Sequence, residues 1–393
     1  MKKICIVVPP NLPMPPVKGG AIETLMQYIA DVNEIERKLD ITFISLWDEK
    51  AEQQAKKYKF SRYVYFHWNT IDDVKWFVFR AIRKLTGVNI HVLEPYEYFV
   101  SKYVLDNEFD AFINESADFN AFKHVSDVLG KEKCYAHLHS EFPANRVIDS
   151  TFKTIISVSE YIKKQWLKTS KVDPDQVVVL QNCADKERFT KTLVKEDQIL
   201  LRKQLGLSAS DFVVYFCGRI VPEKGILELM NAIISIKDSE VKLLVIGSPN
   251  FGHDGKDTPY LEKVKKVISE NKDRVKFTGY IDNNELYKYY SISNCVVVPS
   301  TYEDPAPLVP IESLMAGKAL IVTNTGGAPE YVTKESAIVV TKEHDLEEQL
   351  QEQLLRIKHD AYFKDSLEKE ARKRAENFTK EQYYNNFVSI LNK

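Results

Sequence analysis

The sequence predicts an α/β protein built from two doubly wound domains. Short apolar runs alternate with helical patterns along the whole 393-residue chain, as parallel βα units require. The chain is also longer than one hydrophobic core usually organises, so two cores of ordinary size fit it. With 44% hydrophobic and 28% charged residues, the composition is typical of a soluble globular protein and excludes a fibrous or disordered chain.

Strand-like runs rich in Val, Ile and aromatic residues recur in both halves. In the first half they cover residues 4–8, 41–46, 111–113, 135–139, 155–158 and 177–180. In the second half they cover 213–217, 243–246, 275–278, 295–299, 320–323 and 337–340, with helical patterns at 226–237 and 260–270 between them. The last segment predicts a helix with Tyr384, Phe387, Val388 and Leu391 on one face, and that stripe needs a surface to cover.

Charged residues interrupt the strand pattern between about Asp185 and Leu205, and we place the domain boundary there. The predicted division is 1–190, 191–375 and a C-terminal helical segment 376–393. Glycine is absent from residues 131–205, whereas ten glycines lie between Gly206 and Gly327. Glycines directly after strands allow tight turns and bring backbone N–H groups close to phosphates, so the second domain is the better candidate for holding a nucleotide.

Charge, cysteine usage and hydropathy restrict the partners and the compartment. Lys and Arg total 54 against 56 Asp and Glu, so we expect no nucleic-acid partner. The five cysteines lack metal-ligand spacing and are interpreted as reduced residues of a cytosolic protein. The first apolar run stops at Pro9, so we expect no signal peptide, and no window approaches the roughly 20 apolar residues that span a bilayer.

Residues 75–84 mix aromatic and cationic side chains, as helices at a membrane interface do. Peripheral membrane contact is one interpretation of this segment. A core-packed helix with a solvated basic edge explains the same pattern equally well.

Three strand-to-helix loops of the second half carry candidate ligand-binding residues. In the loop 218–225, Arg219 and Lys224 could face one diphosphate, although an ordinary solvated loop is an equally weighted interpretation. In the segment 300–317, Glu312 at a helix start could accept ribose hydroxyl groups or merely complement the helix dipole. A third glycine loop lies at 325–330, and three such loops at strand ends of one domain favour a ligand site.

With these motifs in place, nearly the whole chain resembles the retaining glycosyltransferases of family four. The markers are Gly19-Gly20, His139, residues 157–159, Asn182 with Asp185 and Phe189, Gly218-Arg219 with Lys224-Gly225, Pro299-Ser300, the segment Asp304 to Glu312, and Gly326-Gly327 with Glu330. The resemblance implies the GT-B fold, in which two Rossmann-like domains face a central cleft. It also implies that the C-terminal helix crosses back and packs on the first domain.

The resemblance assigns donor-binding roles to the second domain. It implies that Arg219 and Lys224 stabilise the donor diphosphate and that Glu312 binds the nucleotide ribose. The first acidic position of the motif, which approaches the donor sugar, is usually Glu in the family. Here that position is Asp304, and the preceding Glu303 could substitute for it.

A second departure from the family pattern is a proline where glycine is common. Pro307 has no N–H to offer a phosphate, so Leu308 and Val309 become the expected backbone donors.

In the first domain the resemblance implies two further contributions. His139 lines the donor-sugar site and is counted with Arg219, Lys224 and Asp304 among the catalytic residues, while a core histidine is the plainer alternative. Gly19 and Gly20 let backbone amides close over the diphosphate. We expect His137 to point to the opposite face of the strand, and we expect neither a bound metal nor a cofactor.

The predicted activity is retaining transfer of a sugar, of the hexosyltransferase type, from a nucleotide-diphosphate sugar to a saccharide acceptor. UDP is the favoured donor nucleotide, and the acceptor is free or lipid-linked, as in cell-surface polysaccharide or glycoconjugate synthesis. The predicted location is cytoplasmic, with the inner face of the cell membrane as one site of action. Two alternatives stay open, namely a nucleotide-sugar epimerase of the same fold and a non-catalytic nucleotide-sugar-binding partner.

Overall fold

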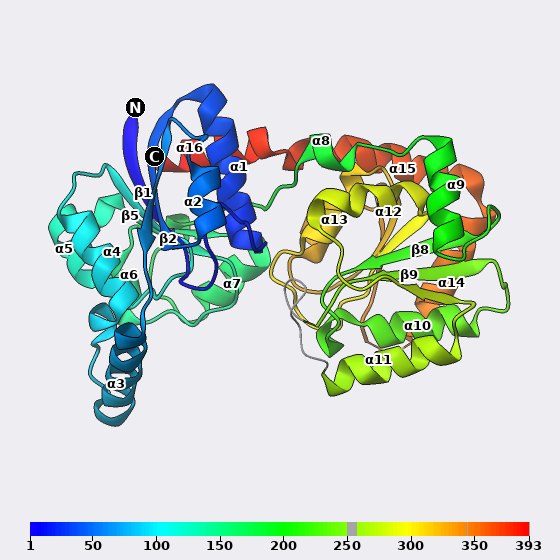
Figure 1. Ribbon diagram of the computed structural model, residues 1–393, viewed down its shortest axis with the longest axis horizontal. Helices are drawn as coiled ribbons and strands as arrows, with labels where there is room; N and C mark the ends of the chain where they lie inside the picture. The colour runs from blue at the N-terminus through cyan, green and yellow to red at the C-terminus, as the bar shows by residue number, and fades with distance from the viewer. Residues whose placement is uncertain (250–257, 344, 393) are drawn as a thin grey trace. The chain divides into compact units, whose positions relative to one another are not determined.

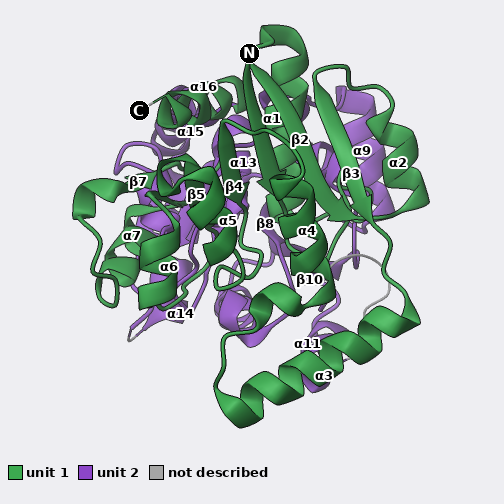
Figure 2. Ribbon diagram, turned by 90° about the vertical axis from the view of Figure 1, so that its left-hand side faces the viewer, with its two compact units in different colours: residues 1–182, 380–393 green, residues 183–379 purple. Residues whose placement is uncertain are grey.

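A computed structural model describes residues 1–249, 258–343 and 345–392 (Figure 1). The described chain divides into two compact units. Unit 1 comprises Met1–Asn182 and Lys380–Lys393, and unit 2 comprises Cys183–Thr379 (Figure 2). Gly252 and Gly255, two of the ten glycines of the second half, lie outside the described residues.

Unit 1 is built on a parallel sheet of seven strands in its described part, in the order β3-β2-β1-β4-β5-β6-β7. Buried and mostly apolar runs form the strands other than the edge strands β3 and β7, as expected where helices cover both faces of a parallel sheet. The strands are β1 (Lys2–Val7), β2 (Leu39–Leu46), β3 (Ser61–Phe66), β4 (Ala111–Asn114), β5 (Cys134–Leu138), β6 (Thr154–Ser157) and β7 (Val177–Val179). The helices are α1 (Ala21–Glu36), α2 (Glu49–Ala55), α3 (Thr70–Thr86), η1 (His91–Leu93), α4 (Pro95–Leu105), α5 (Lys123–Leu129), η2 (Lys131–Lys133), α6 (Arg146–Thr151), α7 (Glu160–Leu167), η3 (Pro174–Gln176) and α16 (Lys380–Leu391).

Unit 2 repeats the design with six parallel strands among its described residues, in the order β10-β9-β8-β11-β12-β13. The strands are β8 (Phe212–Cys217), β9 (Val241–Ile246), β10 (Val275–Phe277), β11 (Cys295–Val298), β12 (Ala319–Thr323) and β13 (Ile338–Val340). The helices are α8 (Lys186–Phe189), α9 (Lys195–Gln204), η4 (Pro222–Lys224), α10 (Ile226–Ser235), α11 (Pro259–Glu270), η5 (Asn283–Glu285), α12 (Leu286–Ile292), α13 (Leu308–Met315), η6 (Ala328–Tyr331), α14 (Leu346–His359), α15 (Ala361–Ala375) and η7 (Glu376–Phe378).

Alternate residues of β8 belong to different cores of unit 2. Val214 and Phe216 pack with α10 and α14, whereas Val213 and Tyr215 pack with α12 and α13. Helices therefore cover both faces of the sheet, which confirms the doubly wound α/β fold.

The last helix, α16, belongs to unit 1 although the chain reaches it from unit 2. Its buried residues include Tyr384, Phe387 and Leu391, which belong to the predicted stripe. The Tyr384 hydroxyl donates to Asn33 Oδ1 of α1 at 2.6 Å, and Lys2 Nζ donates to the carbonyl of Leu391. The expected return of the C-terminal helix to the first domain is thus confirmed.

Each sheet has one place where the strand order reverses, between β1 and β4 in unit 1 and between β8 and β11 in unit 2. In doubly wound sheets the loops after such strands diverge and leave room for a ligand at their carboxyl ends. Gly19, Gly20, Arg219, Lys224, Glu303 and Asp304 lie in these loops, whereas His139 follows β5 and Leu308, Val309 and Glu312 belong to α13.

Candidate functional site

The three candidate loops of unit 2 follow β8, β11 and β12, which are neighbours in the sheet. Close backbone approach joins them. A Cβ on Gly225, whose φ is 67°, would lie 1.9 Å from the carbonyl oxygen of Pro299, and one on Gly326 would lie 2.1 Å from that of Asp304. The Gly327 N–H donates to the Asp304 carbonyl at 2.8 Å, and the Thr301 N–H bonds across to the β8 loop. Glycine is therefore required where the loops touch.

Lys224 and Asp304 form an ion pair at the point where the strand order of unit 2 reverses. Lys224 comes from the loop after β8, and the largely buried Asp304 comes from the loop after β11. The Lys224 ammonium also lies 5.7 Å from the centre of the Tyr302 ring. Arg219 is half-buried in the same loop as Lys224. Two adjacent loops thus bring together the cations Arg219 and Lys224 and the carboxylate of Asp304.

Glu303 has a different set of partners from its neighbour Asp304. Its carboxylate accepts from the Gly326 N–H and pairs with Lys342. The Lys342 side chain and this N–H hold the pKa of Glu303 below its usual range. Glu303 therefore fastens the β11 loop to the loop after β12, whereas Asp304 contacts the cation of the β8 loop.

Helix α13 begins immediately after Pro307. Prolines at 307 and 310 have no N–H, so Leu308 and Val309 supply the N–H groups of the first two helical positions. These groups carry the positive end of the helix dipole, which favours an anion.

Glu312 lies in the second turn of α13. Burial raises the pKa of its carboxyl to about 7, although the hydrogen bond from Tyr290 and the charge of Arg188 act in the opposite direction. The Tyr290 hydroxyl donates to Glu312 Oε2 at 3.1 Å. The Glu312 carboxyl can therefore accept hydrogen bonds from hydroxyl groups, and it ionises near neutral pH.

In unit 1, Gly19 and Gly20 precede α1 with φ values of 77° and 107°. Gly20 is the N-cap of that helix, and the side chain of Glu23 folds back against it. A Cβ on Gly20 would lie 2.1 Å from Glu23 Oε2. Burial raises the pKa of Glu23 to about 6, and sequence reasoning had not singled this carboxyl out.

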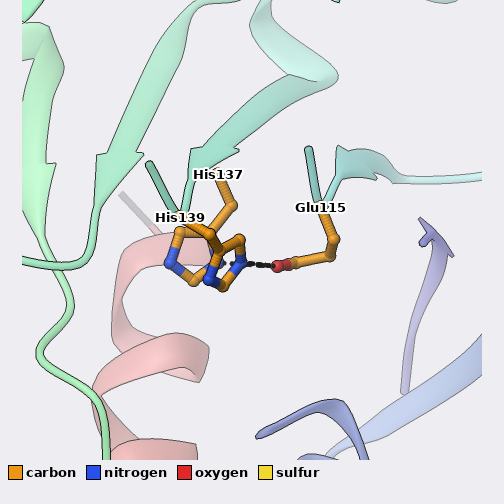
Figure 3. Close-up of side chains that lie close together, drawn as sticks. All are labelled: Glu115, His137 and His139. Carbon is orange, nitrogen blue, oxygen red and sulfur yellow. Dashed lines mark hydrogen bonds and ion pairs between the residues drawn. The ribbon is translucent and has the colours of Figure 1, made fainter. Parts of the chain in front are cut away.

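His139 follows β5 and contacts Glu115, which follows β4 (Figure 3). His139 Nε2 lies 2.7 Å from Glu115 Oε2, and His137 Nδ1 lies 2.8 Å from the same oxygen. The expectation that His137 points to the opposite face was wrong, because residues two apart share one face of a strand. The two imidazole rings lie 4.1 Å apart. Glu115 was missed because its partners become visible only when β4 and β5 pair.

The protonation of this cluster follows from its contacts. Burial alone would raise the pKa of Glu115, but the two imidazoles lower it to about 2. Burial and the neighbouring His137 lower the pKa of His139 to about 4, against the opposing effect of Glu115. Near neutral pH the carboxylate is therefore ionised and can only accept, so His139 carries its proton on Nε2 and its Nδ1 is an acceptor.

Ser116 connects the two loops that hold the cluster. Its φ of 62° lies in the left-handed region, which is uncommon for a residue with a side chain. The Ser116 hydroxyl donates to the His137 carbonyl at 2.9 Å and accepts from the His139 N–H at 3.3 Å. This bridge fixes the position of His139 relative to β4.

A pocket of about 290 Å³ adjoins the cluster within unit 1. Polar side chains and two aromatic rings line it. The lining residues are His91, Ser116, Ala117, Asp118, Phe119, Asn120, Ser140 and Phe142. Phe142 is 38% exposed, so its ring offers an apolar face beside several hydrogen-bonding groups.

Two groups of described residues bring metal-ligand atoms within 4.8 Å of one another, although no bound metal is expected from the sequence. One is Glu115 with His137 and His139, and the other is His91 with Glu94 and Asp118. In both groups hydrogen bonds or ion pairs already join the side chains, including Arg83 to Glu94 and His91 to Asp118.

Comparison with known proteins identifies the class of this chain. Residues 197–376 match the family described as glycosyl transferases group 1. The chain is 25% identical to a lipopolysaccharide 1,2-N-acetylglucosaminetransferase of Salmonella typhimurium over 84% of this chain and 83% of that one. It is 24% identical to spore coat protein SA of Bacillus subtilis over 100% and 99% of the two chains.

Solved structures share the fold over the full length. The Anabaena protein HepE, crystallised with UDP-glucose, superposes with a TM-score of 0.76 at 17% identity over 100% of both chains. A glycosyltransferase from Rickettsia africae superposes with a TM-score of 0.78 at 17% identity over 99% and 98% of the two chains. The chain is therefore a glycosyltransferase with the GT-B fold, and its residues 197–376 match the group 1 glycosyl transferases.

Proposed function

We propose that this enzyme transfers a hexose, with retention of the anomeric configuration, from a nucleotide-diphosphate sugar to a saccharide acceptor. A UDP-sugar is the favoured donor, since the similar HepE was crystallised with UDP-glucose. The similarity to a lipopolysaccharide N-acetylglucosaminetransferase favours a lipid-linked acceptor in cell-surface polysaccharide or glycoconjugate synthesis, at the inner face of the cell membrane.

The observation that carries the donor assignment is the pair of cations beside a helix start at the strand reversal of unit 2. Arg219 and Lys224 lie in the β8 loop, and the N–H groups of Leu308 and Val309 begin α13. A diphosphate needs such an arrangement of cations and backbone donors. Glu312 lies one turn further along α13, and we assign to it the hydrogen bonds from the ribose hydroxyls of the same nucleotide.

The chemistry follows from these placements. In the proposed step the acceptor oxygen bonds to the anomeric carbon on the face from which the diphosphate leaves, and the hydroxyl proton passes to the departing phosphate oxygen. Arg219 and Lys224 stabilise the charge that develops on the leaving group, an effect that can supply several kcal/mol. Asp304 orients hydroxyls of the donor sugar, and the acceptor nitrogen Nδ1 of His139 is suited to orienting a sugar hydroxyl.

The pocket in unit 1 is the proposed acceptor site. Its two aromatic rings and its polar groups fit an uncharged sugar, because planar amide and carboxylate groups accept and orient hydroxyls. Asp118 is the carboxylate of this lining, and its hydrogen bonds to His91 and Asn120 lower its pKa against the effect of burial.

The donor assignment is tested by thermal-shift measurements with UDP, GDP, dTDP and ADP and their sugars. One nucleotide should raise the melting temperature of the wild type, and Arg219→Ala and Glu312→Ala should abolish the shift. Lys263→Ala, which removes an exposed cation from α11, is the matched control and should keep it. If no nucleotide stabilises the protein, or if both site variants respond like the control, the proposed donor site is wrong.

Product analysis separates transfer from the two alternatives. The transferase should release the nucleotide only when an acceptor saccharide is present, apart from slow hydrolysis. Conversion of the donor sugar without any acceptor would instead indicate an epimerase. Tight nucleotide-sugar binding with no turnover in acceptor mixtures would indicate a binding protein. The configuration of the new linkage, measured by proton NMR, tests retention directly.

A further inference from the structure

The polar contacts of helix α3 face the rest of unit 1. The buried Asp72 closes a capping box with Asn69, and Arg83 pairs with Glu94 and lies 2.9 Å from His91 Nδ1. These contacts dock α3 onto η1 and the start of α4. Both views show the helix extending past the sheet of unit 1 (Figure 1, Figure 2).

The opposite side of α3 is apolar and exposed. Six large apolar side chains lie there, with between 40% and 86% of their surface accessible. They are Ile71, Val74, Phe77, Val78, Ile82 and Leu85. At 3.6 residues per turn they fall within an arc of about 140°. A surface helix normally buries its apolar stripe, and an exposed stripe of this size is typical of an interaction surface.

The charges around this apolar face have one predominant sign. Lys75, Arg80 and Lys84 are exposed along its edges. Among the described residues no carboxylate lies within ion-pair distance of these three cations, and Arg80 instead lies 4.8 Å from the centre of the Trp76 ring. Within Thr70–Thr86, which the structure describes completely, the acidic residues are the buried Asp72 and Asp73, which accepts from Trp68.

We propose that α3 docks on an anionic lipid bilayer, with its apolar stripe inserted at the level of the headgroups and its cations against the lipid phosphates. The charge pattern favours a membrane over a second copy of this chain. A two-fold contact through this face would gather the cations of both copies around one apolar patch, whereas anionic lipids neutralise them. No helix of the described residues is long and apolar enough to span a bilayer, so α3 would lie in the surface plane.

The test is co-sedimentation of the full-length protein with two kinds of vesicle. One contains phosphatidylcholine and phosphatidylglycerol in equal amounts, and the other contains phosphatidylcholine alone. The protein should bind the anionic vesicles at least tenfold more tightly, and salt should weaken this binding. Phe77→Ser with Leu85→Ser should lower the affinity at least tenfold, because each inserted side chain contributes an order of magnitude or so.

Two further variants complete the design. Ile35→Ser with Tyr362→Ser removes two equally exposed apolar side chains from α1 and α15 and should leave vesicle binding unchanged. Lys75→Gln with Lys84→Gln should lower binding to the anionic vesicles about tenfold or more. All these positions are exposed, so the melting temperatures should stay close to that of the wild type.

Three results would overturn the proposal. They are absence of binding to the anionic vesicles, equal binding to both vesicle types, and equal losses in the α3 and control pairs. A wild-type dimer in sedimentation velocity that Phe77→Ser with Leu85→Ser converts to monomer, without vesicle binding, would assign the face to a second copy. None of these readouts depends on transferase activity, so this inference stands or fails independently of the proposed function.

Discussion

Replacing Glu312 by Gln should raise the stability of the free enzyme at alkaline pH and abolish nucleotide binding. The substitution keeps the shape of the side chain and an oxygen that can accept from the Tyr290 hydroxyl. It removes the ionisation of a carboxyl that burial holds at a pKa of about 7. If Glu312 binds ribose hydroxyls, stability and function should therefore change in opposite directions.

The magnitude follows from the difference between the folded and unfolded pKa values. The pKa rises from 4.5 to about 7, and each unit corresponds to about 1.4 kcal/mol. Because the pKa of Glu312 is raised in the folded state, its contribution to folding stability is fully present below pH 4.5 and is lost as the pH rises through about 7. Between pH 5 and pH 8 the free energy of unfolding of the wild type should fall by about 2.5 kcal/mol, and that of Glu312→Gln should not show this loss.

Melting curves of both proteins between pH 5 and pH 8 measure this difference. For a unit the size of unit 2, about 2.5 kcal/mol corresponds to roughly 5–10 °C in melting temperature. Glu262→Gln, at an exposed carboxyl of α11, should follow the wild type. If the Glu312→Gln curve stays parallel to the wild-type curve across this range, the carboxyl ionises normally and the reasoning from burial is refuted.

Three further substitutions test the loops and the last helix. Gly225→Ala should lower the stability of unit 2 by several kcal/mol in thermal unfolding, because its Cβ would lie 1.9 Å from a carbonyl oxygen of the β11 loop. Gly19→Ala, which has open space around it, should lower the stability by only about 1 kcal/mol. Asp304→Asn should tighten UDP binding, measured by calorimetry, up to about tenfold, because the charge of Lys224 is no longer neutralised, and it should lower kcat. Weaker UDP binding by this variant would instead mean that the Asp304 carboxylate orients Lys224. Tyr384→Phe should lower the free energy of unfolding by about 1 kcal/mol, because α16 loses its 2.6 Å hydrogen bond to α1. An unchanged midpoint of denaturant unfolding would contradict this prediction.

Periodicity was sufficient to predict most of the fold. Twelve strand-like runs correspond to strands, because strands covered by helices on both faces are continuous apolar stretches. The strand that was missed, β3, lies at the edge of its sheet and is only partly buried. Its run from Ser61 to Phe66 mixes Arg62 with aromatic residues, so it lacks the purely apolar signal.

The site was predictable only where the position of a residue after a strand implies which other loops lie beside it. The three glycine loops were found because carboxyl ends of parallel strands meet at one edge, and the structure joins them by contacts of Gly225 and Gly326. The pairing of Lys224 with Asp304, rather than with Glu303, depends on side-chain directions that no spacing encodes. Glu115 escaped notice because it has no partner within its own stretch of sequence.

The same topological feature locates the charged groups of both sheets, but their chemistry differs. In unit 1 the carboxyl ends of β4 and β5 hold a carboxylate beside two imidazoles, which is suited to accepting and orienting hydroxyl groups. In unit 2 the loops after β8 and β11 hold cations and a helix start, which are suited to a diphosphate. The fold thus determines where polar groups can gather, because strand and helix interiors are buried and apolar. Residue choice at those strand ends then favours a hydroxyl-binding role for unit 1 and a nucleotide-binding role for unit 2.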